Sequence, residues 1–312
     1  MSFFRLFLVA AFAALAVLPA RAEKLTVYLD WFVNPGHAPL VIAETQGYFA
    51  EQGLEVEIVP PSDPSAPPRL IAAGQGDIAI SYQPQLHVQV AEGLPLTRIG
   101  TLVETPLNSL VVLADGPIKQ IADFKGKKVG FSVGGFEDAL LGAMLKTHGV
   151  ELSEVELINI NFALSPSLIT GAVDGVIGAF RNFELNQLDL EKRPGIAFYP
   201  EEHGVPVYDE LIFVVNNERL DDPRFRKFML AIEKAALYLT NDSDAALAAF
   251  LKAYPDLDNE LNRRAWVDTL PRFAKRPAAL DSGRYERFAD FMKASGLIKE
   301  TVPLESYAVE LR

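Results

Sequence analysis

The sequence predicts an α/β protein of two similar lobes with a ligand cleft between them. Short runs rich in β-branched and apolar residues alternate with helical patterns, which is typical of parallel β–α units. The alternation restarts near Ile118 and gives way to helical pattern alone from Pro223. A short internal repeat connects the two halves. These three observations predict that each lobe is a mixed sheet flanked by helices.

The first half of the chain consists of strand patterns separated by short helical patterns. Runs such as KLTVYL and DIAISY have the length and composition of buried strands. The helical pattern at 37–50 is followed by Gly53, a residue type that commonly ends helices, and PPSDPSAPP predicts a loop. The expected strands of this half are 24–29, 54–59, 77–82, 96–104 and 109–114, and the expected helices are 37–50, 69–74 and 84–93.

The second half repeats this order. KKVGFSV predicts a strand, and the helical pattern after it ends near Gly149. The expected strands of this half are 127–133, 155–160, 174–180 and 209–216, and the expected helices are 118–126, 136–149, 165–172 and 182–192, with further helices after residue 223.

The internal repeat is formed by residues 70–82 and 168–180. Both segments contain a short helix, a G-x-x-D turn, an apolar strand and then an aromatic residue. The acids are Asp77 and Asp174, and the aromatic residue comes one position later in the second copy. The repeat indicates a duplicated unit, although chance similarity of two common strand–turn patterns is the alternative.

Two extended apolar runs, SLVVLAD and ELIFVVN, flank the second set of units. We expect them to be two hinge strands that cross between the lobes. One lobe then comprises residues 23–112 and 212–312, and the other comprises residues 113–211. In such a venus-flytrap layout the ligand binds in the cleft, at the carboxyl ends of the strands.

Residues 1–22 have the order of a secretory signal peptide. Arg5 precedes the uncharged apolar run Leu6–Leu18, and Ala20-Arg21-Ala22 is an A-x-A cleavage pattern. The run is too short to span a bilayer, and an uncleaved membrane anchor is the alternative. We therefore expect export to the periplasm and cleavage after Ala22.

The composition excludes several classes of function. The net charge is −12, and it becomes −14 without the first 22 residues, which contain two arginines and no acid. A chain this acidic is a poor binder of nucleic acid or anionic lipid surfaces. The sequence has no cysteine, which excludes thiol nucleophiles, cysteine-ligated zinc, iron–sulfur clusters and a lipid-modified N-terminal cysteine.

The sequence also lacks several common catalytic motifs. None of H-E-x-x-H, the P-loop or G-x-G-x-x-G occurs. The four histidines are scattered along the chain, so we expect no metal site. They are His37, His87, His148 and His203.

The loop after the first strand, LDWFVNPGHAPL, holds Asp30, Trp31, Asn34 and His37. Loops at this end of an open α/β sheet bind ligands. Tryptophan offers a flat π-rich wall, asparagine a donor and an acceptor, and histidine a further polar contact, which together suit a small heteroaromatic ligand. The alternative is that Trp31 packs under the loop and Asn34 forms an Asx turn.

Later strand ends add more candidates. Tyr82 ends the strand DIAISY, and Asn182 and Glu184 follow the strand DGVIGAF. Glu184 can accept a hydrogen bond from an amino group on an aromatic ring, or it can be a simple first-turn acid of a helix. Gly134 lies in the turn FSVGGFEDA, whose N–H groups can hold an anion or a polar group, unless this is an ordinary strand–helix turn.

These motifs, in this order, resemble the thiamine-pyrimidine-precursor binding proteins of bacterial ABC importers, which are relatives of fungal hydroxymethylpyrimidine synthase. The resemblance extends from Leu25 to about Arg272 and is carried by LDWFVNPGHAPL, GYFAEQGLEVEIVPP, GDIAISYQP, DFKGKKVGFSVGGFED and GAFRNFEL. It implies a type II periplasmic binding protein that delivers N-formyl-4-amino-5-aminomethyl-2-methylpyrimidine, or a close analogue such as hydroxymethylpyrimidine, to a membrane permease.

The resemblance also implies roles for individual residues. An aminopyrimidine would stack on Trp31 and Tyr82, and its ring nitrogen and exocyclic amine would pair with Glu184. Asn34 and His37 match the polar positions of the W-x-x-N-x-x-H loop.

The fungal relatives are enzymes that consume an active-site histidine and need an iron-binding, cysteine-rich segment. Because this sequence has no cysteine, we expect a binding protein that is not an enzyme and uses no cofactor. We also expect it to be a monomer. The wider neighbours of the family bind sulfonates, nitrate, riboflavin or hydantoins, and these ligands are the alternatives. An exported, pyrimidine synthase-like enzyme is the alternative of another class.

Overall fold

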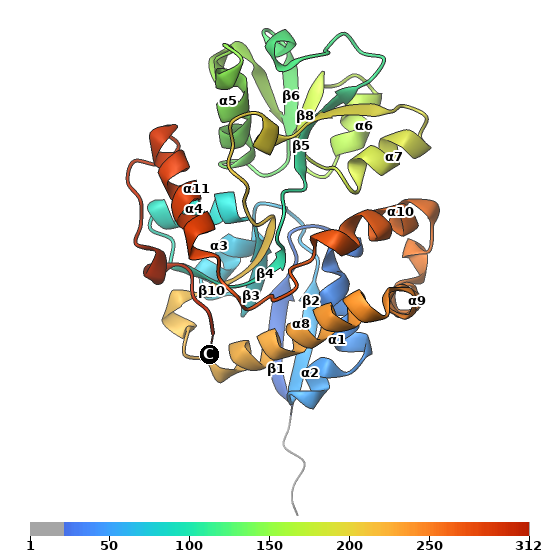
Figure 1. Ribbon diagram of the computed structural model, residues 1–312, viewed down its shortest axis with the longest axis vertical. Coiled ribbons are helices and arrows are strands. Elements are labelled where there is room, and N and C mark those ends of the chain that lie inside the picture. Colours follow the sequence, from blue (N-terminus) through green and yellow to red (C-terminus); the bar gives the residue numbers. More distant parts are fainter. Residues whose placement is uncertain (1–21, 312) are drawn as a thin grey trace, which may run out of the picture.

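The computed structural model describes residues 22–311, which form two lobes, each built on a five-stranded mixed sheet (Figure 1). The expected signal peptide falls on residues 1–22, almost all of which lie outside the described residues. Within 22–311, every helix is too short or too polar to cross a lipid bilayer. The predicted fold class, α/β with two lobes and a mixed sheet in each, is confirmed.

The sheet of the first lobe has the strand order β2-β1-β3-β10-β4. Strand β1 runs parallel to β2 and β3, whereas β10 is antiparallel to β3 and β4. The loops that follow β1 and β3 therefore leave the sheet at the same edge. The strands are β1 (Glu23–Tyr28), β2 (Leu54–Val59), β3 (Ile78–Ser81), β4 (Leu96–Val103) and β10 (Leu211–Asn216).

Both faces of this sheet are covered by helices, because alternate residues of a strand point to opposite faces. Phe213 and Val215 of β10 pack into one core cluster with α1, α2, α8 and α9, whereas Ile212 and Val214 pack with α3, α4 and α11. The helices are α1 (Ala38–Thr45), α2 (Tyr48–Glu51), α3 (Pro67–Ala72), α4 (Gln83–Ala91), α8 (Pro223–Asn241), α9 (Ser243–Ala253) and α11 (Ser282–Ala294).

The second lobe has the strand order β7-β6-β8-β5-β9, with β6 parallel to β7 and β8. Leu110 and Val112 of β5 face α5, and Val111 faces α6 and α7. The elements are β5 (Asn108–Leu113), β6 (Lys128–Phe131), β7 (Glu156–Asn159), β8 (Gly175–Phe180), β9 (Gly195–Phe198), α5 (Glu137–Thr147), α6 (Leu164–Ile169) and α7 (Glu184–Leu190).

Helix α10 (Glu260–Thr269) lies beside α7 of the second lobe and also contacts η1 of the first (Figure 1). It therefore connects the two lobes on one side. The 3-10 helices are η1 (Pro35–His37), η2 (Ile121–Phe124), η3 (Leu152–Glu154), η4 (Pro200–Glu202), η5 (Asn217–Arg219), η6 (Pro255–Leu257), η7 (Leu270–Arg272) and η8 (Leu304–Ser306).

The strand pairing differs from the expected lobe boundaries. The run SLVVLAD forms most of β5, which pairs with β8 and β9, so residues 108–112 belong to the second sheet and not to the first. The run ELIFVVN forms β10, which pairs within the first sheet. Neither run crosses between lobes: the chain crosses in the segments 104–107 and 199–210.

Two further differences have local causes. The helical pattern at 37–50 is broken into α1 and α2 by Gly47, whose φ of 74° is the left-handed conformation that glycine adopts without strain. Strand β9 was not expected, because its four residues, GIAF, are too short to show an alternating pattern.

The internal repeat occupies equivalent places in the two sheets. Asp77 precedes β3, and its Oδ2 accepts from the N–H of Thr26 on the neighbouring strand β1 at 2.8 Å. Asp174 precedes β8, and its Oδ2 accepts from the N–H of Lys128 on β6, also at 2.8 Å. The shared acid therefore accepts from one backbone N–H of the adjacent parallel strand in each lobe.

Candidate functional site

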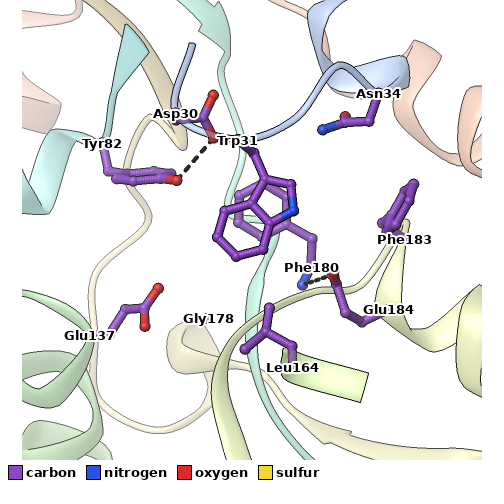
Figure 2. Close-up of a pocket in the computed structure, with 10 residues that line it drawn as sticks. All are labelled: Asp30, Trp31, Asn34, Tyr82, Glu137, Leu164, Gly178, Phe180, Phe183 and Glu184. Atoms are coloured by element: carbon purple, nitrogen blue, oxygen red, sulfur yellow. Dashed lines mark hydrogen bonds between the residues drawn. The ribbon is translucent and has the colours of Figure 1, made fainter. Parts of the chain in front are cut away.

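A pocket lies between the lobes, where the carboxyl ends of β1 and β3 face those of β6 and β8 (Figure 2). It encloses about 410 Å³ of space not filled by atoms, part of it open to solvent. The pocket is lined by Asp30, Trp31, Asn34, Tyr82, Glu137, Leu164, Gly178, Phe180, Phe183 and Glu184.

Asp30 is held by two side chains of its own lobe. One carboxyl oxygen lies 2.9 Å from His37 Nε2, and the other accepts from the Tyr82 hydroxyl at 2.9 Å. His37 Nδ1 accepts from the backbone N–H of Asn34, so the ring proton resides on Nε2 and is donated to Asp30. Both oxygens of Asp30 are therefore engaged by the protein.

His37 lies behind the pocket. Its side chain is 1% exposed and is not among the lining residues, so the structure does not bring it to the pocket with the other candidates. The loop spacing could not show this, because Asp30 folds back between the imidazole and the cavity. His37 positions Asp30, and through it Tyr82.

Asn34 both forms an Asx turn and lines the pocket, the two possibilities that the sequence left open. Its Oδ1 accepts from the N–H of Gly36 at 2.7 Å, which is the Asx turn that begins η1. Its Nδ2 donates to the carbonyl of Phe32 at 3.0 Å, and the side chain still lines the pocket. One Nδ2 hydrogen remains available to a bound molecule.

Trp31 forms a wall of the pocket and touches the other lobe. Its ring meets Phe162 edge-on, with centroids 4.6 Å apart and an interplanar angle of 67°. It also packs against the apolar cluster of the second lobe that contains Leu164. Phe32 extends this contact to Phe183, at 6.1 Å between centroids. Aromatic residues of the first lobe therefore close against the second lobe at the pocket.

The side chain of Tyr82 is largely covered by other parts of the protein, so little of its ring is free to stack on a ligand. Its ring stacks on Phe136 of the second lobe at 4.8 Å and 25°, and its hydroxyl is bound to Asp30. Phe136 already covers one face of the ring, so only the rest of Tyr82 is available to the pocket.

Glu184 is the first residue of α7 and lines the pocket from the second lobe. Its Oε2 accepts from the N–H of Phe180 at 2.7 Å. Burial raises the pKa of the Glu184 carboxyl to about 7, against the lowering effect of hydrogen bonds from the backbone N–H groups of Phe180 and of Glu184 itself. The group can therefore carry or release a proton near neutral pH.

Glu137, which the sequence reasoning missed, is a second carboxyl in the same pocket. It begins α5, and its Oε2 accepts from the N–H groups of Ser132 at 2.7 Å and Val133 at 3.1 Å. Burial raises the pKa of Glu137 to about 8, although these two hydrogen bonds lower it. The sequence feature that could have pointed to Glu137 is Gly178, because a glycine inside an apolar strand often marks a place where another group packs closely against the backbone.

Two expected residues lie elsewhere. Asn182 is buried outside the pocket, where its Nδ2 donates to Thr269 Oγ1 of α10 at 2.6 Å. Gly134 does not line the pocket either. The N–H groups of its turn serve the chain's own acids, because Ser132 and Val133 donate to Glu137 and Gly135 donates to Asp138.

The ten lining residues include three acids and no lysine or arginine. Within residues 22–311, no group of three or more histidine, aspartate or glutamate side chains is arranged to hold a metal ion. The arrangement can enclose a flat apolar ring against Trp31 and accept hydrogen bonds from donors on that ring. It offers no cationic side chain for an anionic solute.

Comparison with known sequences gives relatives over most of the chain. A Haemophilus influenzae protein named for thiamine biosynthesis is 53% identical over 94% of this chain and 94% of its own length. The formylaminopyrimidine-binding protein of Halalkalibacterium halodurans is 33% identical over 73% of this chain and 70% of its own. A 4-amino-5-hydroxymethyl-2-methylpyrimidine phosphate synthase of Legionella pneumophila is 26% identical over 85% and 86%.

Comparison with solved structures supports the two-lobed fold. The alkanesulfonate-binding protein SsuA of Xanthomonas axonopodis pv. citri superposes with a TM-score of 0.71 at 17% identity, covering 92% of this chain and 98% of that one. A Candida albicans protein with the periplasmic binding protein fold gives 0.71 at 18% identity, covering 92% and 96%. The family model described as NMT1/THI5 like matches residues 34–246. The chain therefore belongs to the NMT1/THI5-like family.

Proposed function

We propose that the chain is the periplasmic solute-binding protein of an ABC importer and that it binds a thiamine pyrimidine precursor between its lobes. The solute would be N-formyl-4-amino-5-aminomethyl-2-methylpyrimidine or a close analogue with the same 4-aminopyrimidine ring. The protein binds this solute without converting it and delivers it to a membrane permease.

The observation that carries the proposal is the placement of Glu184 and Trp31 on two sides of one pocket (Figure 2). An aminopyrimidine has a flat ring for the indole and, beside each other, a ring nitrogen and an amino group for a carboxyl. Because the pKa of Glu184 is near 7, the carboxyl can share its proton with the ring nitrogen while it accepts from the amine.

The relatives and the lining residues agree with this choice of solute. One relative is named for binding formylaminopyrimidine and another for making a pyrimidine with the same ring. The absence of lysine and arginine from the ten lining residues disfavours a sulfonate or nitrate, which would be bound by cationic side chains or by free N–H groups at helix ends, and the three acids that line the pocket would repel it.

The first test is direct binding by the chain without its first 22 residues. Thermal stability and calorimetric titration are measured with formylaminopyrimidine, hydroxymethylpyrimidine, thiamine, riboflavin and taurine. We expect stabilisation by the two pyrimidines and recovery of unchanged ligand after binding. Stabilisation by riboflavin or taurine alone would overturn the choice of solute, and turnover of a pyrimidine would show an enzyme.

The second test replaces the carboxyl. Glu184→Gln keeps an oxygen for the N–H of Phe180 but puts an amide in place of the ligand's acceptor, so affinity for the aminopyrimidine should fall about 10- to 100-fold. Glu191→Gln, at the exposed C-terminal end of the same helix, is the matched control and should bind like the unaltered protein. Unchanged affinity in Glu184→Gln would show that another group holds the ring.

A further inference from the structure

We propose that Glu137 is a second recognition group of the pocket and that it takes a protonated amine on the ligand. Within the proposed class of solutes, the protein then binds the analogue with a free aminomethyl group more tightly than the N-formyl compound named above or the hydroxymethyl form, although all three share the ring that the pocket accepts. This inference rests on the proposed function and narrows its substrate class.

Glu137 has one oxygen bound and one directed to the pocket. Oε2 accepts the two backbone N–H groups of the turn before α5, and no other hydrogen bond to this carboxyl is found between residues 22 and 311. The side chain is 4% exposed and lines the pocket. Because the protein supplies no donor to this inward-facing oxygen within residues 22–311, the oxygen is available to a ligand.

The space for this carboxyl is provided by Gly178. A Cβ atom at that position would lie 2.4 Å from Glu137 Oε1, closer than side-chain atoms approach. The φ of Gly178 is +96°, a conformation that other residues adopt only with strain. The strand is therefore built so that Glu137 reaches the pocket instead of being covered by a side chain of β8.

Glu137 and Glu184 are placed as a pair. They begin the helices that follow β6 and β8, two neighbouring parallel strands, and each binds backbone N–H groups at the end of its strand. Figure 2 shows them on either side of the Trp31 ring. A flat ligand against Trp31 can present one donor group to each carboxyl, whereas a ligand with a single donor leaves one of them unpaired.

The charge of the pocket favours a cation at this position. Three acids line it without a basic residue, and Glu210 and Asp138 add negative charge near Glu137. Burial raises the pKa of Glu137 to about 8, so the empty pocket keeps it protonated at neutral pH. An ammonium group on the ligand would offset the cost of burying the ionised Glu137 carboxylate, because an ion pair stabilises the charge that solvent cannot reach.

The alternative is that Glu137 only holds the turn at Ser132 and Val133. A residue with that role affects folding stability but does not distinguish between ligands that differ in one substituent. The ranking of such ligands therefore separates the two roles.

The experiment is calorimetric titration at pH 7 with three pyrimidines that share the 4-amino-2-methyl ring and carry aminomethyl, formamidomethyl or hydroxymethyl at position 5. In the unaltered protein we expect the aminomethyl compound to bind about tenfold tighter than the hydroxymethyl compound. In Glu137→Gln this preference should disappear, while affinity for the hydroxymethyl compound changes less than about threefold.

Asp138→Asn is the matched control, because Asp138 accepts from Gly135 in the same turn and does not line the pocket. It should keep most of the preference for the amine, because the charge of Asp138 has the smallest of the named effects on the pKa of Glu137. Even if Glu137→Gln does not fold, the ranking in the unaltered protein can still overturn the inference. Equal or weaker binding of the aminomethyl compound, or a preference that survives in Glu137→Gln, would overturn the inference and leave the proposed function standing. Failure of all three pyrimidines to bind would overturn both.

Discussion

The two lobes place acids after equivalent strands, but they use them in opposite ways. In the first lobe, Asp30 follows β1, and its two oxygens are engaged by His37 and Tyr82. In the second lobe, Glu137 and Glu184 follow β6 and β8, and each has hydrogen bonds from the backbone on one oxygen. Both carboxyl oxygens of Asp30 thus have hydrogen-bond partners within the protein. Glu137 and Glu184 each have one oxygen that can still accept a hydrogen bond from a ligand.

This difference indicates that the acid of the first lobe positions other side chains, whereas the acids of the second lobe are available to recognise a ligand. The acid of the first lobe fixes the aromatic wall, since it holds Tyr82 and the loop that carries Trp31. The acids of the second lobe have raised pKa values because burial disfavours their charge and the protein does not fully offset it. Changes in the first lobe should therefore alter stability, and changes in the second lobe should alter affinity and pH dependence.

The largest expected effect is on stability, from Asp30→Asn. The amide nitrogen cannot accept a hydrogen bond, so either His37 Nε2–H or the Tyr82 hydroxyl loses its buried acceptor. We expect the free energy of unfolding of the empty protein to fall by about 3 kcal/mol, measured by urea denaturation. Glu184→Gln is the comparison and should lose little. Equal losses in the two variants would remove the distinction between the lobes.

The next effect is a pH dependence that belongs to the second lobe. The pKa of Glu137 rises from its ordinary 4.5 in the unfolded chain to about 8 in the folded protein. Between these pH values the folded protein retains a proton that the unfolded chain has released, so stability falls as pH rises. Glu137 should lower the free energy of unfolding by about 2 kcal/mol between pH 5.5 and 7.5.

Glu137→Gln tests whether Glu137 causes this fall in the free energy of unfolding, because a neutral amide resembles the protonated acid. The variant should match the unaltered protein at pH 5.5 and be more stable than it at pH 7.5, in denaturation measured at both pH values. A variant whose stability falls with pH as steeply as that of the unaltered protein would contradict the assignment.

The smallest effect sharpens the role of the first lobe. Tyr82→Phe removes one hydrogen bond to Asp30 and should cost about 1.5 kcal/mol in thermal or urea denaturation. Because the hydroxyl is already used within the protein, affinity for the aminopyrimidine should change less than about threefold. A loss of affinity above tenfold would place the hydroxyl on the ligand.

Much of the fold was predictable because its signals are local. Apolar strand runs and helical patterns predicted most elements, and the G-x-x-D repeat predicted two lobes of like construction. The lobe boundary was not predictable in the same way. SLVVLAD has the composition of a buried strand in either sheet, and only its pairing with β8 and β9 assigns it to the second.

The site shows the same division. Trp31, Tyr82 and Glu184 line the pocket as their positions at strand ends indicated, but His37 does not, because its direction depends on a bond to Asp30. Glu137 was missed because its access depends on Gly178, a residue on another strand 41 positions later. Strand ends identify candidate side chains, while contacts between distant segments decide which of them face the ligand.

The connection of α10 to the second lobe has a kinetic consequence. Asn182 donates to Thr269, Asn186 donates to Asp268, and Asp189 pairs with Arg264, so three residues around α7 are joined to a helix that also touches the first lobe. None of these six residues lines the pocket. In the proposed function we expect opening of the cleft to break such contacts, so that residues which never touch the solute govern part of its residence time.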